Sequence, residues 1–132
     1  MDLEFIDPLR AELARRGDVA LAILFGSHAK GSARADSDVD LGVIPLIEWS
    51  LGQELQIAAA LSSVVGSEVD LVRIDVDDPL LGHELVETGR CVYEYTPGRY
   101  AAYRARAHIT WLEFDEVAWP HRQAFLRRVA GK

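Results

Sequence analysis

GSHAKGSARADSDVDL, residues 26–41, is the stretch that decides the fold and the chemistry expected of this chain. It follows an apolar run, residues 19–25, that is typical of a buried strand. The stretch itself offers a Gly-Ser turn, a short polar helix and a second strand entered through alternating aspartates. Because successive side chains of a strand point to opposite faces, Asp38 and Asp40 are expected on the same face. Two carboxylates this close repel each other unless a cation or a proton lies between them. The pattern therefore predicts a cation site at a sheet edge, beside the Gly-Ser turn.

The other segments predict a small α/β domain, with a mixed sheet flanked by helices, followed by a helical tail. Asp7 is the expected N-cap of the first helix, and Pro120 is expected to break the tail after about residue 117. The inward stripe expected on the third helix consists of Leu51, Leu55, Ala58, Leu61 and Val65. Helices are expected at residues 8–16, 27–34, 51–65 and 79–87, and strands at residues 19–25, 39–44, 68–74 and 90–95.

Composition predicts one folded domain over residues 1–132. Hydrophobic residues make up 49% of the chain and charged residues 27%, which favours a packed core over disorder. No apolar run approaches the roughly 20 residues that cross a bilayer, and the first residues lack a secretory signal pattern. The single cysteine, Cys91, cannot form an internal disulfide and is interpreted as a small buried side chain. We therefore expect a cytoplasmic protein with no membrane partner.

Charge is distributed unevenly between two parts of the domain. Residues 1–98, the expected catalytic core, carry 7 basic and 18 acidic side chains, whereas residues 99–132, the expected helical tail, carry 7 basic and 3 acidic ones. The formal net charge of −7 argues against direct nucleic-acid binding, which needs a basic face. The split suggests that the tail has a role different from that of the core.

A third carboxylate completes the expected cation site. Asp70 has the polar parity of its strand, and it lies across from Asp38 and Asp40 if the second and third strands are neighbours. Three carboxylates on adjacent strands can hold two magnesium ions about 3.5–4 Å apart, the spacing used in two-metal phosphoryl transfer. Asp70 could also accept the proton of an attacking hydroxyl. The expected chemistry is in-line attack on the α-phosphate of a nucleoside triphosphate, with pyrophosphate leaving.

The turn after the first strand is the expected phosphate site. Unpaired backbone N–H groups at Ser27 favour an anion, and Gly26 permits close approach of backbone to ligand. Lys30 and Arg34 could neutralise phosphate charge or form ordinary surface ion pairs, and the two interpretations have equal weight. Asp36 and Ser37 are interpreted mainly as turn residues. The four histidines show no metal-ligand spacing and are interpreted as surface or packing residues, namely His28, His83, His108 and His121.

These residues resemble the nucleotidyltransferase superfamily that includes DNA polymerase beta. Its signature is a Gly-Ser pair, an Asp-x-Asp and a later single aspartate. The matching positions are Gly26, Ser27, Asp38, Asp40 and Asp70. With Gly31 and Ser37, the longer string is similar to the minimal nucleotidyltransferases of the MntA type. The resemblance covers residues 19–74 and implies the nucleotidyltransferase fold.

What the resemblance implies is an antitoxin that transfers AMP from ATP to a tyrosine of a cognate HEPN ribonuclease toxin and so silences it. Asp38 and Asp40 would hold the metal ions and Asp70 would complete the catalytic set. Gly26 and Ser27 would bind the triphosphate, with Lys30, Arg34 and Ser37 as further nucleotide contacts. Two alternatives stay open: a nucleotidyltransferase for a small molecule of the aminoglycoside kind, and a non-catalytic antitoxin that only binds its partner.

The tail carries six of the eleven aromatic residues, interleaved with arginines. Aromatic residues and arginine are enriched at the anchors of protein interfaces, so a docking surface for the toxin is one interpretation. The other is that most of these aromatics pack onto the sheet as a helical cover. The aromatic residues are Tyr100, Tyr103, Trp111, Phe114, Trp119 and Phe125, and the arginines are Arg99, Arg104, Arg106, Arg122, Arg127 and Arg128.

Overall fold

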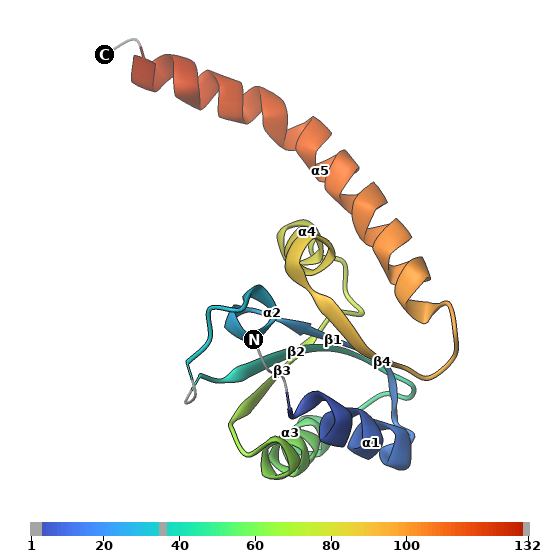
Figure 1. The fold of residues 1–132 in the computed structure, drawn as a ribbon. Helices are drawn as coiled ribbons and strands as arrows, with labels where there is room; N and C mark the ends of the chain where they lie inside the picture. The colour runs from blue at the N-terminus through green and yellow to red at the C-terminus, as the bar shows by residue number, and fades with distance from the viewer. Residues whose placement is uncertain (1–3, 35–36, 131–132) are drawn as a thin grey trace.

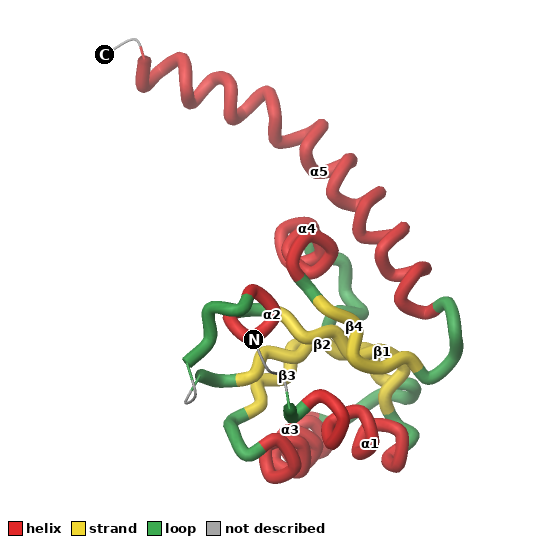
Figure 2. Tube along the Cα trace, in the orientation of Figure 1, coloured by secondary structure: helices red, strands yellow, loops and turns green. Residues whose placement is uncertain are grey.

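A four-stranded mixed sheet with helices on both faces forms the body of the protein, and a long C-terminal helix extends from it (Figures 1 and 2). The computed structural model describes residues 4–34 and 37–130, with side chains in the last helix described to residue 117 and at 127 and 128. The elements in chain order are α1 (Ile6–Arg16), β1 (Val19–Phe25), α2 (Ser27–Lys30), β2 (Val39–Pro45), α3 (Leu51–Val65), β3 (Val69–Arg73), α4 (Pro79–Thr88), β4 (Arg90–Glu94) and α5 (Arg99–Ala130). The α/β class with a mixed sheet and a helical tail is confirmed.

The strand order is β3-β2-β1-β4, so the second and third strands are neighbours as the sequence analysis required. β1 pairs antiparallel with β2 and with β4, whereas β2 and β3 run parallel. In this register Asp40 faces Asp70 on one side and Phe25 on the other. The start of β2 therefore lies between the end of β1 and the start of β3.

Each face of the sheet packs against its own pair of helices. On one face, under α1 and α3, the alternate strand residues Val39, Leu41 and Val43 are fully buried. On the other face Leu21 and Ile23 pack with Leu85 of α4 and with the start of α5. Alternation then places the even-numbered residues of β2 and β3, Asp40 and Asp70 included, on the α4–α5 face. Cys91 of β4 is only partly buried on that face, and burial raises the pKa of its thiol.

Two helix ends differ from the predicted ones: the start of α1 and the end of α2. Phe5, not Asp7, is the N-cap of α1, and no side chain caps this end. Asp7 instead pairs with Arg10 at 3.2 Å within the first turn. The second helix ends at Lys30 rather than at residue 34, because Gly31 adopts a left-handed conformation (φ 76°) that terminates it.

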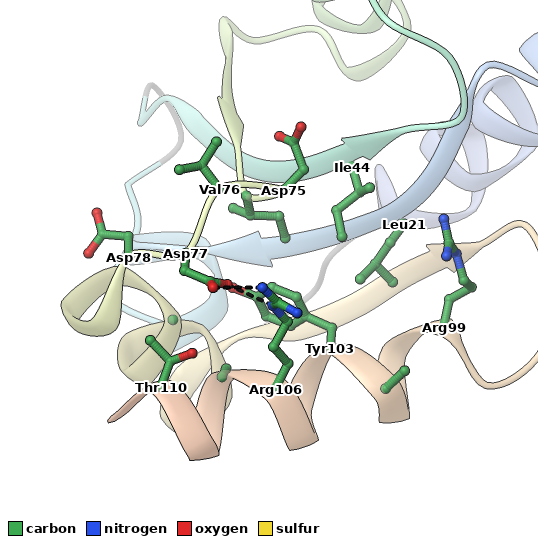
Figure 3. Close-up of a pocket in the computed structure, with 14 residues that line it drawn as sticks. Leu21, Ile44, Asp75, Val76, Asp77, Asp78, Arg99, Tyr103, Arg106 and Thr110 are labelled. Carbon is green, nitrogen blue, oxygen red and sulfur yellow. Dashed lines mark hydrogen bonds and ion pairs between the residues drawn. The ribbon is translucent and has the colours of Figure 1, made fainter. Parts of the chain in front are cut away.

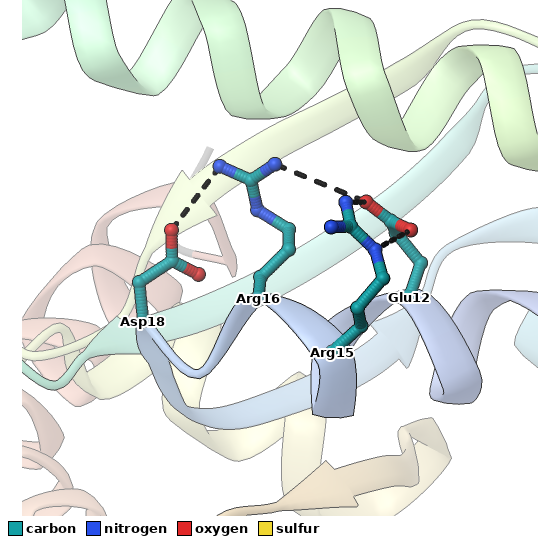
Figure 4. A network of polar contacts seen from close by, with 4 residues as sticks. All are labelled: Glu12, Arg15, Arg16 and Asp18. Atoms are coloured by element: carbon teal, nitrogen blue, oxygen red, sulfur yellow. Dashed lines mark hydrogen bonds and ion pairs between the residues drawn. The ribbon is translucent and has the colours of Figure 1, made fainter.

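The C-terminal end of α1 is joined to the start of β1 by a small ion-pair network (Figure 4). Arg16 contacts Asp18 at 3.1 Å and Glu12 at 3.9 Å, and Arg15 contacts Glu12 at 2.6 Å. The hydrogen bond from Arg15 lowers the pKa of Glu12. Partly exposed pairs of this kind contribute up to about 1 kcal/mol each, so the buried strands remain the main source of stability.

The first two residues of the apolar stripe predicted on α3 do not face the core. Leu51 and Leu55 are 72% and 64% exposed, whereas Ile57 and Leu61 are 3% and 0% exposed. The helix is apolar on more than one side, so periodicity alone does not select the side that meets α1 and β3. The four-residue step from Ile57 to Leu61 is the buried one.

The tail is a single helix, α5, of 32 residues. The predicted break at Pro120 is wrong, because the helix continues through it to Ala130; proline removes one backbone hydrogen bond but does not end the helix here. At its start Tyr100 and Tyr103 pack onto the sheet, and further along Trp111 stacks on His83 of α4 at 3.9 Å between ring centroids. These contacts fit the cover interpretation, while Trp119, Arg122 and Phe125 have side chains outside the described part. No helix among the described residues is long and apolar enough to cross a membrane.

Replacing Leu61 by alanine tests which side of α3 carries the core. Leu61→Ala removes a fully buried side chain and should lower the free energy of unfolding by about 2–5 kcal/mol. The control Leu55→Ala, at a side chain that is 64% exposed, should change it by less than about 0.5 kcal/mol. Urea denaturation of both variants measures this; equal losses would contradict the assigned face.

Candidate functional site

Two strands bring three carboxylates to one end of the sheet. Asp40 and Asp70 are register partners in the parallel pair of β2 and β3, and they share a face. Asp38 directly precedes β2, on the same parity as Asp40. Asp38 and Asp70 are exposed and Asp40 is partly buried, so all three carboxylates lie outside the hydrophobic core. The three sequence-predicted aspartates therefore lie at the same end of the sheet, at a place that a ligand can reach.

The pKa of Asp40 is affected by its burial and by the other two carboxylates. Burial raises the pKa of its carboxyl, and the charges of Asp70 and Asp38 raise it further. Glu84 of α4 adds to this effect, while His28 acts in the opposite direction. Asp40 therefore lies in a field of excess negative charge, which a bound cation would relieve.

The three aspartates offer hard oxygen donors of the kind that magnesium binds. Among residues 4–34 and 37–130, however, no three acidic, histidine or cysteine side chains are already close enough together to enclose an ion. The donor chemistry and the raised pKa of Asp40 fit a divalent cation, and Asp38, Asp40 and Asp70 are the residues that would hold it.

Gly26 packs directly against the Asp40 carboxylate. Its backbone (φ 75°, ψ −152°) lies in a region that side chains exclude, and a Cβ at this position would overlap the carboxylate. Glycine is thus required twice here, for conformation and for space. The close approach places the Gly-Ser turn against the acidic cluster.

The predicted phosphate contacts lie around α2. Ser27 is the first residue of this helix, directly after Gly26. Lys30, at its end, forms an ion pair with Glu84 of α4 at 3.2 Å, both side chains being nearly half exposed. Lys30 is therefore engaged in the surface pair that was one of its two predicted roles, close to the acidic cluster.

Ser37, just before β2, is hydrogen-bonded back to Arg34. The Ser37 hydroxyl accepts a hydrogen bond from the Arg34 backbone N–H at 2.8 Å, and the Ser37 N–H donates to the Arg34 carbonyl at 3.1 Å. This is the turn role expected of Ser37, and it fixes the chain just before Asp38. Asp36 lies outside the described residues.

Two residues near the site were not singled out from the sequence. The Nε2 atom of His28 lies 3.1 Å from the carbonyl oxygen of Ser37, and its charge acts on Asp40. Its position directly after Ser27 was an available signal. Glu84 had no such signal, because only the packing of α4 over the sheet brings it near Asp40.

A separate cavity lies on the same face of the sheet, under the first turns of α5 (Figure 3). Its volume is about 440 Å³, and its walls include Leu21, Ile44 and Ile74. Arg106 of α5 closes one side by a two-pronged hydrogen bond to Asp77, at 2.8 Å for each contact. None of the three carboxylates of the acidic cluster lines this cavity.

Comparison with known proteins identifies the class. The sequence profile of the family described as "Polymerase beta, Nucleotidyltransferase" matches residues 8–97, which include every element from β1 to β4 and all three aspartates. The chain therefore belongs to the polymerase beta nucleotidyltransferase family. No protein with a curated functional description matches the chain significantly in sequence.

Solved structures agree with this class. A toxin–antitoxin crystallised with AMP-PNP is 22% identical with a TM-score of 0.72, over 95% of this chain and 98% of that one. The tri-AMPylated Shewanella oneidensis HEPN toxin in complex with MNT antitoxin contains a similar chain, 20% identical with a TM-score of 0.68, over 98% of this chain and 99% of that one. A protein assigned as a minimal nucleotidyltransferase is 31% identical with a TM-score of 0.56, over 68% of this chain and 95% of that one. The fold is thus that of compact nucleotidyltransferases.

Substitution of Gly26 tests the close packing at the turn. Gly26→Ala combines an excluded backbone conformation with overlap on Asp40 and should cost about 2–5 kcal/mol of stability. In Gly31→Ala the backbone is in the milder left-handed region (φ 76°, ψ 14°), and no atom lies within 4 Å of the added carbon, so the cost should stay at about 1 kcal/mol. Thermal unfolding of both variants measures the difference, and equal shifts would refute the contact with Asp40.

Removal of the Asp40 charge should stabilise the protein. A raised pKa means that the folded state binds a proton more tightly than the unfolded chain, so ionisation of Asp40 costs stability as the pH rises. Asp40→Asn should therefore raise Tm at pH 7, without divalent cations, by about 1–4 °C. The gain should vanish as the pH falls towards the ordinary pKa of 3.8. The control is Glu68→Gln, at an exposed position just before β3. A lower Tm for Asp40→Asn would contradict the raised pKa of Asp40.

Proposed function

We propose that this nucleotidyltransferase is an antitoxin that transfers AMP from ATP to a tyrosine of a cognate HEPN ribonuclease toxin. The observation that carries the proposal is the placement of Asp38, Asp40 and Asp70 at one end of the sheet, with Asp40 packed against Gly26 of the Gly-Ser turn. A protein that only bound its partner would gain nothing from a carboxyl whose pKa is raised by burial and by the charges of two neighbouring carboxylates. The cluster is explained by a reaction at a phosphate.

In the proposed reaction the acceptor hydroxyl attacks the α-phosphorus of ATP in line with the leaving group. A new phosphorus–oxygen bond forms to the acceptor, the bond to the β-phosphate oxygen breaks, and pyrophosphate leaves with the electron pair. Asp70 takes the proton of the hydroxyl. The backbone at Gly26 and Ser27 holds the β- and γ-phosphates, with Lys30, Arg34 and Ser37 as further contacts. Magnesium, when bound by the three aspartates, neutralises phosphate charge.

The proposed partner is a protein for two reasons. The similar structures include toxin–antitoxin complexes, and in one of them the HEPN toxin is AMPylated. In addition, α5 extends well beyond the sheet (Figure 1). Its apolar side chains Ile109, Leu112 and Val117 are between 53% and 70% exposed. We place the docking surface for the toxin on this tail, residues 99–132.

A second candidate function is AMP transfer to a small molecule. The cavity under α5 favours it, because a volume of about 440 Å³ on the face of the acidic cluster suits a small ligand. The acceptor would then be a hydroxyl of that molecule instead of a toxin tyrosine. The same three aspartates would bind the metal and take up the proton.

The test is intact mass spectrometry of the partner toxin after incubation with the antitoxin, ATP and Mg²⁺. Wild type should add one or more adenylyl groups, located on tyrosine by peptide mapping. Asp38→Asn and Asp40→Asn should lower the rate about 100-fold or more, while both variants remain folded. Asp7→Asn, 91% exposed on α1, is the matched control and should keep the wild-type rate.

The outcomes separate the alternatives. An unmodified toxin that is nevertheless inhibited would indicate neutralisation by binding alone. An unmodified toxin together with adenylylation of a hydroxylated small molecule would support the second candidate. Unchanged transfer in both aspartate variants would refute the assigned site.

A further inference from the structure

His28, on α2, contacts residues from two other segments of the chain. It lies in α2, one residue after Ser27, and its ring packs edge-on against Phe5 at 5.3 Å between centroids. Its Nε2 atom is 3.1 Å from the carbonyl oxygen of Ser37, nine residues further along the chain. The side chain is partly buried between these contacts. It therefore joins the segment before α1, the Gly-Ser turn and the chain that enters β2.

The contact with Ser37 shows that the Nε2 atom of the ring carries a proton. A carbonyl oxygen can only accept a hydrogen bond, so Nε2 must carry a proton and donate it. Ser37 is fixed on its other side by the two hydrogen bonds with Arg34. The His28 bond thus attaches Ser37, the residue before Asp38, to α2.

We propose that His28 is a positioning residue for nucleotidyl transfer: its Nε2–H···O bond to Ser37 sets the place of the Asp38 carboxylate relative to Asp40 and Asp70. This rests on the proposed function and concerns the same site. Asp40 and Asp70 are fixed by the ladder between β2 and β3, whereas Asp38 precedes the first paired residue, Val39. Asp38 is accordingly the one carboxylate of the three that needs support from outside the sheet.

Two other roles of His28 can be separated from this one. The ring could serve only to pack against Phe5, or its charge could act on Asp40 directly. His28→Phe keeps an aromatic ring beside Phe5 but removes the donor. His28→Gln restores a neutral N–H donor at the place of Nε2 without charge or ring. Phe5→Leu removes the ring contact and leaves the hydrogen bond.

The experiment compares the three variants by hydrogen exchange over residues 37–41, in the protein without nucleotide, and by the rate of AMP transfer. In His28→Phe the amides at Ser37 and Asp38 should exchange about 10-fold faster, and kcat should fall about 10- to 100-fold, as for other residues that orient metal ligands. KM for the toxin should change less than about 3-fold, because His28 is not part of the docking surface proposed on α5. His28→Gln should recover most of both losses, and Phe5→Leu should resemble wild type in kcat.

Three results would overturn the proposal. One is a His28→Phe variant with wild-type kcat, and another is unchanged exchange at Ser37 and Asp38. The third is a His28→Gln variant as slow as His28→Phe, which would assign the effect to charge or ring. If wild type transfers no AMP, the proposed function fails separately. Hydrogen exchange and the Mg²⁺-dependent affinity for ATP, expected to fall about 10-fold in His28→Phe, then decide the role of His28.

Discussion

The parallel pairing of β2 with β3 is the constraint on which the rest of the structure depends. Val39, Leu41 and Val43 are buried against α1 and α3, and Val69 is buried beside them on β3. With that face committed to the core, alternation forces Asp40 onto the opposite face, next to its register partner Asp70. A shift of either strand by one residue would bury a carboxylate. The hydrophobic core therefore determines the chemistry of the site.

Two features of the site destabilise the folded protein locally. Asp40 is partly desolvated and faces two further carboxylates, so its pKa is raised. Gly26 holds an excluded backbone conformation directly against it. Neither feature helps the sheet to fold, and both are offset by the buried apolar side chains of β1 and β2. Such concentrated, uncompensated charge is typical of sites that bind a cation or a charged substrate.

Much of this arrangement could be predicted because it depends on short-range rules. Strand alternation predicted that Asp38 and Asp40 would share a face, and that Asp70 would join them if β2 and β3 are neighbours, as they are. Gly17 and Gly66, both left-handed, end α1 and α3 where the sequence predicted. The assignment of these residues to metal and nucleotide stays a prediction.

The features that were missed depend on tertiary packing. The buried side of α3 is selected by its contacts with α1 and β3, and not by its own periodicity. Glu84 reaches the site only because α4 crosses the sheet, and His28 acquires its role through Ser37, nine residues away. The continuation of α5 through Pro120 shows a sequence signal overridden by the helix on both sides of it.

The most direct test of the central claim is a crystal structure with Mn²⁺ and a non-hydrolysable ATP analogue, using anomalous scattering to locate the metal. The account predicts one or two manganese peaks within about 2.5 Å of carboxylate oxygens of Asp38, Asp40 and Asp70, with the α-phosphate beside them. Manganese bound elsewhere, or an α-phosphate remote from these three carboxylates, would contradict it.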